Sequence, residues 1–71
     1  MWVITVKGKP ATLGKINQEE RKSHNARDLD YQEVDTYLTG KTKGAAVELY
    51  LFNYGFTWRE RPKTVDVKKI V

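Results

Sequence analysis

Basic and aromatic side chains are concentrated toward the C-terminal end of this sequence. Segment 47–58, VELYLFNYGFTW, holds five of the eight aromatic residues. The basic residues that follow it are Arg59, Arg61, Lys63, Lys68 and Lys69. Positive groups neutralise the phosphates of a nucleic acid, and aromatic rings stack on its bases. This combination of residue types therefore indicates a nucleic-acid-binding surface.

The charge of the chain is segregated along the sequence. Its net charge is +4, yet residues 1–18 contain Lys7, Lys9 and Lys15 with no acidic residue, and residues 19–35 contain six acidic residues against three basic ones. If the first and last strands pair, Lys7 and Lys9 join the C-terminal basic residues in one positive surface. The alternative is a lysine-rich sheet edge that discourages strand-to-strand aggregation.

Catalytic and metal-binding patterns are weak in this chain. Glu20, His24 and Asp28 are four residues apart and would share one face of a helix. Segment 17–28 has no apolar residue larger than Ala26, so we expect these groups to be solvated and to lack the burial that tunes catalytic side chains. The chain has no cysteine, which excludes disulfides and thiolate ligands. We therefore expect no enzyme, no cofactor and no metal site.

The N-terminal half predicts two strands and a polar loop. Trp2, Ile4 and Val6 alternate with their neighbours at a period of two, which indicates a strand. A less regular second strand is predicted over residues 11–16. Because segment 17–28 lacks an apolar face, we expect it to form a mobile loop.

A single helix is predicted over residues 31–39. Asp30 followed by Glu33 resembles a capping box at its start, and Gly40 stands where a left-handed residue often ends a helix. The expected buried stripe consists of Tyr31, Val34 and Leu38.

The aromatic segment admits two interpretations. It forms either a buried helix over residues 45–54, which would create a helix-turn-helix, or a hairpin with strands over residues 45–52 and 56–61. We prefer the hairpin, because aromatic and branched residues stand on both sides of the alternation and residues 53–55, NYG, suit a turn. Alternation would then place Tyr50 and Phe52 on an outer sheet face.

These elements, with a last strand that begins at Val65 and Val67 and runs toward Val71, predict a small α+β protein. We expect residues 1–71 to form a single domain with an antiparallel sheet of four to five strands, in the order β-β-α-β-β-β. The helix over residues 31–39 should pack on one face of this sheet. The sequence has no apolar run long enough to span a membrane, so we expect a cytoplasmic protein without membrane contact.

The function expected from these patterns is non-enzymatic binding of DNA or RNA by a basic and aromatic sheet face. Its predicted residues are Lys7, Lys9, Tyr50, Phe52, Arg59, Arg61, Lys63, Lys68 and Lys69. The alternative is a protein-interaction module, such as a small inhibitor or adaptor of the phage or mobile-element type. It would dock by an exposed strand edge or by its acidic helix. A homodimer, in which a second subunit covers the outer face, remains open.

Overall fold

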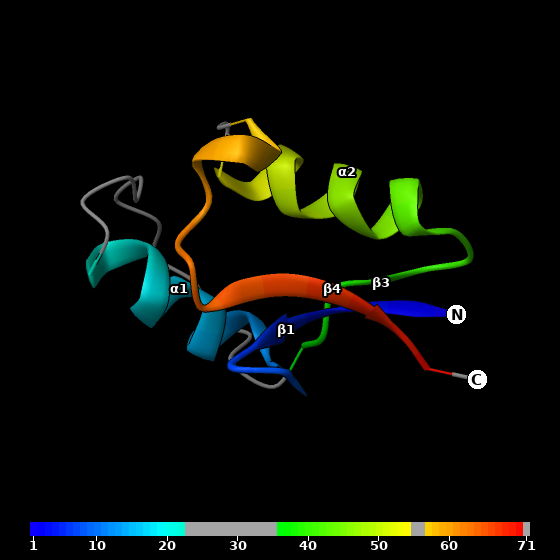
Figure 1. Cartoon of the computed structure of the whole chain (residues 1–71), viewed down its shortest axis with the longest axis horizontal. Coiled ribbons are helices and arrows are strands. Elements are labelled where there is room, and N and C mark those ends of the chain that lie inside the picture. Colours follow the sequence, from blue (N-terminus) through cyan, green and yellow to red (C-terminus); the bar gives the residue numbers. More distant parts are fainter. Residues whose placement is uncertain (23–35, 55–56, 71) are drawn as a thin grey trace.

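The chain folds as a mixed α+β protein with a four-stranded antiparallel sheet (Figure 1). The computed structural model describes residues 1–22, 36–54 and 57–70. In chain order its elements are β1 Trp2–Val6, β2 Lys9–Pro10, α1 Leu13–Lys22, β3 Thr39–Gly40, α2 Lys43–Tyr54, the 3-10 helix η1 Trp58–Glu60 and β4 Val65–Lys69. This architecture confirms the predicted fold class.

Strand β1 is the centre of the sheet. It pairs along its whole length with β4, from Trp2 opposite Lys69 to Val6 opposite Val65. Its other edge is shared by the two short strands, with β2 opposite residues 5–6 and β3 opposite residues 2–3. The first and last strands therefore lie side by side, which is the arrangement that the charge pattern required for one positive surface.

Helix α2 covers one face of the sheet, as seen above the strands in Figure 1. Ala46, Tyr50 and Tyr54 recur every four residues and are buried in the main apolar cluster, which also contains Ile4 and Val65 of the sheet. The helix begins at Thr42, whose side-chain oxygen accepts a hydrogen bond from the Ala45 N–H at 3.1 Å.

The predicted hairpin is wrong. The first of its strands, residues 45–52, is helical, and the described part of the second, residues 57–61, contains η1. Aromatic residues favour strands on average, but here packing overrides this preference. The ring centroids of Tyr50 and Tyr54 lie 4.9 Å apart, and that of Trp58 lies 5.3 Å from Tyr50 in an edge-on arrangement.

Helix α1 replaces the strand predicted over residues 11–16 and the described part of the loop predicted over residues 17–28. Its apolar residues, Leu13 and Ile16, are buried in the main cluster. Its next turn is held by polar contacts: the Tyr54 hydroxyl donates to the Asn17 side-chain oxygen, and the Thr64 hydroxyl donates to the Glu19 carboxylate at 3.0 Å. A polar sequence can therefore face the interior where it finds such partners.

The helix predicted over residues 31–39 is wrong in its described part, and residues 31–35 lie outside the described residues. Tyr37 forms an antiparallel bridge with Thr12, and Leu38 accepts the Ile4 N–H at 3.0 Å before β3 begins. The Leu38 side chain is therefore buried as predicted, but it belongs to an extended segment and not to a helix. Gly40 does not end a helix either, because it lies tightly against the start of α2.

Candidate nucleic-acid interface

The turn between β1 and β2 gathers basic residues from both ends of the chain. Lys7 and Gly8 have φ values of 54° and 81°, so both have a left-handed backbone. A two-residue hairpin turn needs this conformation to match the right-handed twist of the strands that it joins. The Lys7 N–H donates to Thr64 at 2.7 Å, and the Lys68 ammonium donates to the Gly8 carbonyl at 3.4 Å. The predicted residues Lys7, Lys9 and Lys68 are therefore neighbours in the fold.

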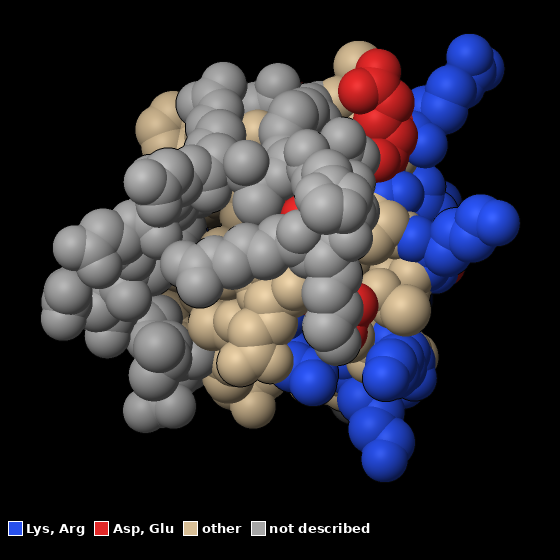
Figure 2. Space-filling view, turned by 90° about the vertical axis from the view of Figure 1, so that its left-hand side faces the viewer, with Lys and Arg blue, Asp and Glu red and all other residues tan. Residues whose placement is uncertain are grey.

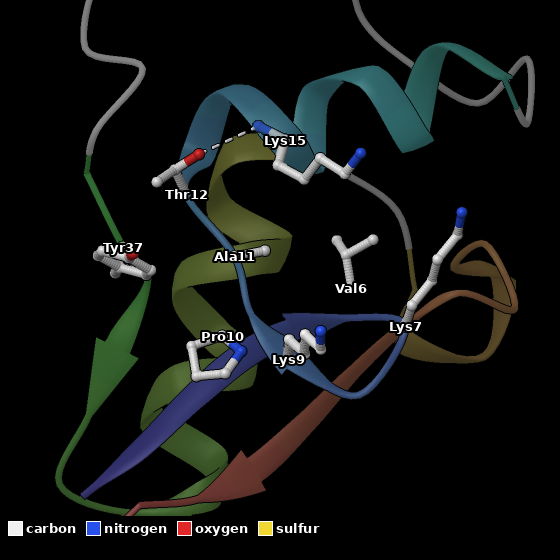
Figure 3. Close-up of a pocket in the computed structure, with 8 residues that line it drawn as sticks. All are labelled: Val6, Lys7, Lys9, Pro10, Ala11, Thr12, Lys15 and Tyr37. Carbon is white, nitrogen blue, oxygen red and sulfur yellow. Dashed lines mark hydrogen bonds between the residues drawn. The ribbon is translucent and has the colours of Figure 1, made fainter.

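A pocket of about 420 Å³ lies beside this turn (Figure 3). The described residues that line it are Val6, Lys7, Lys9, Pro10, Ala11, Thr12, Lys15 and Tyr37. Three of them are lysines and none is acidic. We call Lys7, Lys9 and Lys15, together with Lys68 at the turn, the lysine cluster.

Lys15 and Tyr37 were missed as site residues by the sequence analysis. Lys15 carried a usable signal, because it belongs to the acid-free first 18 residues. It reaches the pocket because α1 starts at Leu13, just after the hairpin, with the Thr12 hydroxyl oxygen accepting the Lys15 N–H at 3.3 Å. Tyr37 carried no such signal, since backbone contacts such as its bridge to Thr12 bring its segment here from a distant part of the sequence.

Three acidic residues described on β4 and α1, the elements that carry Lys68 and Lys15, are buried or paired. Asp66 of β4 forms an ion pair with Arg61 at 3.5 Å, and the side chains of Glu19 and Glu20 on α1 are buried. Figure 2 shows Lys and Arg side chains projecting along one margin of the molecule, the side on which β4 lies in the foreground of Figure 1.

The C-terminal basic residues divide among different surroundings. Successive residues of a strand point to opposite faces, so Lys68 and Lys69 of β4 do not share a surface. Arg59 and Lys63 are exposed on η1 and on the turn after it. None of Arg59, Lys63 and Lys69 lines the pocket.

Arg61 is committed to structural contacts. Its guanidinium lies 4.2 Å from the centre of the Trp58 ring and donates to the Trp58 and Val65 carbonyls at 3.0 and 2.8 Å. Together with the Asp66 ion pair, these contacts fix the segment between η1 and β4. Arg61 therefore holds the fold rather than extending the lysine cluster.

The predicted aromatic sheet face does not exist, because its two rings lie on helix α2. Tyr50 is fully buried in the core and cannot stack on a base. Phe52 is 84% exposed, and it lines a separate hollow with Ala45, Glu48 and Leu49 on the outer side of the helix. Of the predicted site residues, only Lys7, Lys9 and Lys68 come together.

Glu20 has a strongly shifted titration. Burial removes its carboxyl from water and raises its pKa from 4.5 to about 7. Of the triad considered with it, His24 and Asp28 lie outside the described residues. Within residues 1–22, 36–54 and 57–70, no three acidic or histidine side chains form a group that could hold a metal ion.

In the same three described ranges, every helix is too short or too polar to traverse a lipid bilayer. Comparison of the chain with models of protein families, with curated proteins and with solved structures finds no match. Its function must therefore be argued from its own surface.

Proposed function

We propose that the protein binds nucleic acid through the lysine cluster. One observation carries the proposal: Lys7 and Lys9 from the β1–β2 hairpin and Lys15 from α1 line a single pocket, and Lys68 from β4 donates to the Gly8 carbonyl at the hairpin turn beside it. Like charges repel, so a gathering of ammonium groups with no acidic residue among the described lining residues favours a polyanionic ligand. A phosphate backbone is such a ligand.

Protection of a sheet edge accounts for only part of this cluster. Lys68 lies on β4, an edge strand on which lysines hinder pairing with another chain. Lys7 lies in a turn and Lys15 on a helix, where there is no strand edge to protect. Their position beside the pocket is better explained by a ligand.

The proposal predicts a defined salt dependence. If the lysine cluster neutralises about four phosphates of a single strand, the logarithm of the binding constant should fall with the logarithm of the salt concentration with a slope of about −3. Affinity would then decrease roughly 50-fold between about 50 and 200 mM salt.

A pair of double variants tests this role by fluorescence anisotropy with labelled DNA and RNA. Lys7→Gln/Lys15→Gln should weaken binding and make the slope about 1.4 less steep, because two phosphate contacts are lost. Lys41→Gln/Lys43→Gln removes the same charge from exposed positions at the start of α2 and should leave the slope unchanged. The proposal fails if the wild-type protein binds neither nucleic acid at low salt, or if both variants lose affinity equally.

Binding to a protein is the second candidate function, and the exposed side of α2 favours it. Ala45, Leu49 and Phe52 form an apolar stripe at helical spacing, with Leu49 42% and Phe52 84% exposed. Such a stripe suits an apolar surface on a partner, as in helix-in-groove recognition. A partner should be retained from nuclease-treated lysate by the wild-type protein and lost with Phe52→Gln. Equal recovery with both would contradict this role.

A further inference from the structure

The pocket has two chemically different sides. In Figure 3 the Tyr37 ring and Pro10 lie toward the left and Lys7 lies on the right, with Lys15 above and Lys9 below the space between them. A ligand that fits both sides must combine a flat apolar group with negative charge.

The floor of the pocket is formed by buried core residues. Val6 and Ala11 line it, and both are 5% exposed and belong to the main apolar cluster. The bridge between Thr12 and Tyr37 joins the tyrosine segment to the start of α1. A pocket held by core residues and backbone pairing is largely formed before its ligand arrives, which lowers the entropy cost of binding.

Tyr37 provides the stacking surface that Tyr50 was expected to provide. It is 50% exposed, so one part of its side chain is supported by the protein while the other is open to a ligand. Proteins that bind single strands combine such rings with a positive groove that follows the phosphates. Lys7, Lys9 and Lys15 place ammonium groups on the same pocket.

We infer that this pocket receives one unpaired base of a single-stranded nucleic acid, stacked on Tyr37, while the adjoining phosphates contact Lys7, Lys9 and Lys15. This inference rests on the proposed function and makes it more specific. The volume of about 420 Å³ lies in the range of small-ligand pockets, roughly 300 to 1,000 Å³. A base inside a duplex is stacked between its neighbours and cannot enter such a pocket without being extruded.

Thr12 supplies a polar contact at the pocket wall. Its hydroxyl oxygen accepts the Lys15 N–H at 3.3 Å, and a hydroxyl that accepts one hydrogen bond can still donate its own hydrogen. It would donate to a carbonyl oxygen of the base or to a phosphate oxygen. Stacking supplies most of the contact with the base, so we expect little preference among base types.

The inference is tested by substituting Tyr37 and measuring binding to a labelled thymidine oligonucleotide. Tyr37→Ala should lower the affinity roughly 5- to 150-fold, the effect of losing one base–aromatic stack. Tyr37→Phe keeps the ring and should bind like the wild-type protein. The slope of affinity against salt should be the same in all three proteins, because no phosphate contact changes. Amide spectra of each variant establish that it is folded.

A strand of the same length that lacks its bases provides a test on the unaltered protein. Its phosphates are intact, so it should bind the wild-type protein as weakly as the normal strand binds Tyr37→Ala. The substitution should cause no further loss on the abasic strand. A duplex of the same sequence should also bind more weakly than the single strand.

The possible failures are distinguishable. If the wild-type protein binds the single strand but Tyr37→Ala or the abasic strand binds equally well, the base pocket is wrong and phosphate binding by the lysine cluster stands. If the duplex binds as tightly as the single strand, the preference for an unpaired base is overturned. If the wild-type protein binds no nucleic acid at low salt, the proposed function fails and the base pocket fails with it.

Discussion

Replacing Glu20 by glutamine should remove a large pH dependence from the stability of this protein. The Glu20 side chain is fully buried on α1, and its pKa is raised by burial to about 7 from an ordinary value of 4.5. The folded protein therefore keeps this proton over a pH range in which the unfolded chain releases it. The stabilisation is fully present below about pH 4.5 and is lost as the pH rises through about 7.

The expected magnitude follows from the two pKa values. A change from 4.5 to about 7 corresponds to about 3 kcal/mol of unfolding free energy between acid and alkaline conditions. Domains of this length have a total stability of roughly 4 to 10 kcal/mol. The titration of one side chain should therefore remove a substantial part of the stability.

The assay is urea denaturation at about pH 5 and about pH 8. In the folded protein the Glu20 carboxyl is mostly protonated at the lower pH and mostly ionised at the higher one. The wild-type protein should lose on the order of 2 to 3 kcal/mol between them, and Glu20→Gln should lose much less. Glu48→Gln, a matched change at an exposed position of α2, should keep the wild-type dependence. The reasoning is refuted if the wild-type stability does not fall over this interval, or if Glu20→Gln falls as steeply.

Four further substitutions test the packing by urea denaturation. Gly40→Ala should destabilise the protein by about 1–3 kcal/mol, because the new Cβ would lie 2.5 Å from the Ala46 backbone nitrogen; unchanged stability would contradict this close approach. Thr42→Ala should cost about 1 kcal/mol by removing the α2 cap, and no loss would mean that the cap is dispensable. Tyr50→Phe should stabilise the fold by about 1 kcal/mol, because the buried hydroxyl has no hydrogen-bond partner among the described residues. Its nucleic-acid affinity should not change, and weaker binding would show that this ring does reach the ligand. Arg61→Ala should lower the unfolding free energy by roughly 1–2 kcal/mol, because the contacts of the guanidinium with Trp58 and Val65 are lost. A loss of nucleic-acid affinity at unchanged stability would instead place Arg61 in the binding surface.

The two long strands of the sheet, β1 and β4, could be predicted from the sequence because their pattern is local. Trp2, Ile4 and Val6 alternate with other residues, and a strand is the element that turns such alternation into one continuous face. Val65 and Val67 repeat the pattern at the other end of the chain, and the two strands pair. The segregation of charge likewise indicated that Lys7, Lys9 and Lys68 would come together if these strands paired.

The helices could not be predicted with the same certainty, because their patterns are ambiguous. The aromatic segment has a strand-like composition, but Ala46, Tyr50 and Tyr54 recur every four residues, so it equally suits a helix that lays these side chains on the sheet. Segment 17–22 has no apolar face, yet it continues α1 because Asn17 and Glu19 are hydrogen-bonded by Tyr54 and Thr64. Only contacts between distant segments decide such cases.

The sequence alone determined the α+β class, the first and last strands and the positive charge near the first turn, since each depends on residue type and short-range spacing. The tertiary structure decided which ring and which lysines share a pocket. The backbone bridge to Thr12 brings Tyr37 to the pocket that Lys15 also lines, and the helical turn of α2 buries Tyr50 in the core. The physical reason is that a binding surface is formed by residues distant in sequence, and their meeting depends on the free energy of packing the whole chain rather than on any local pattern.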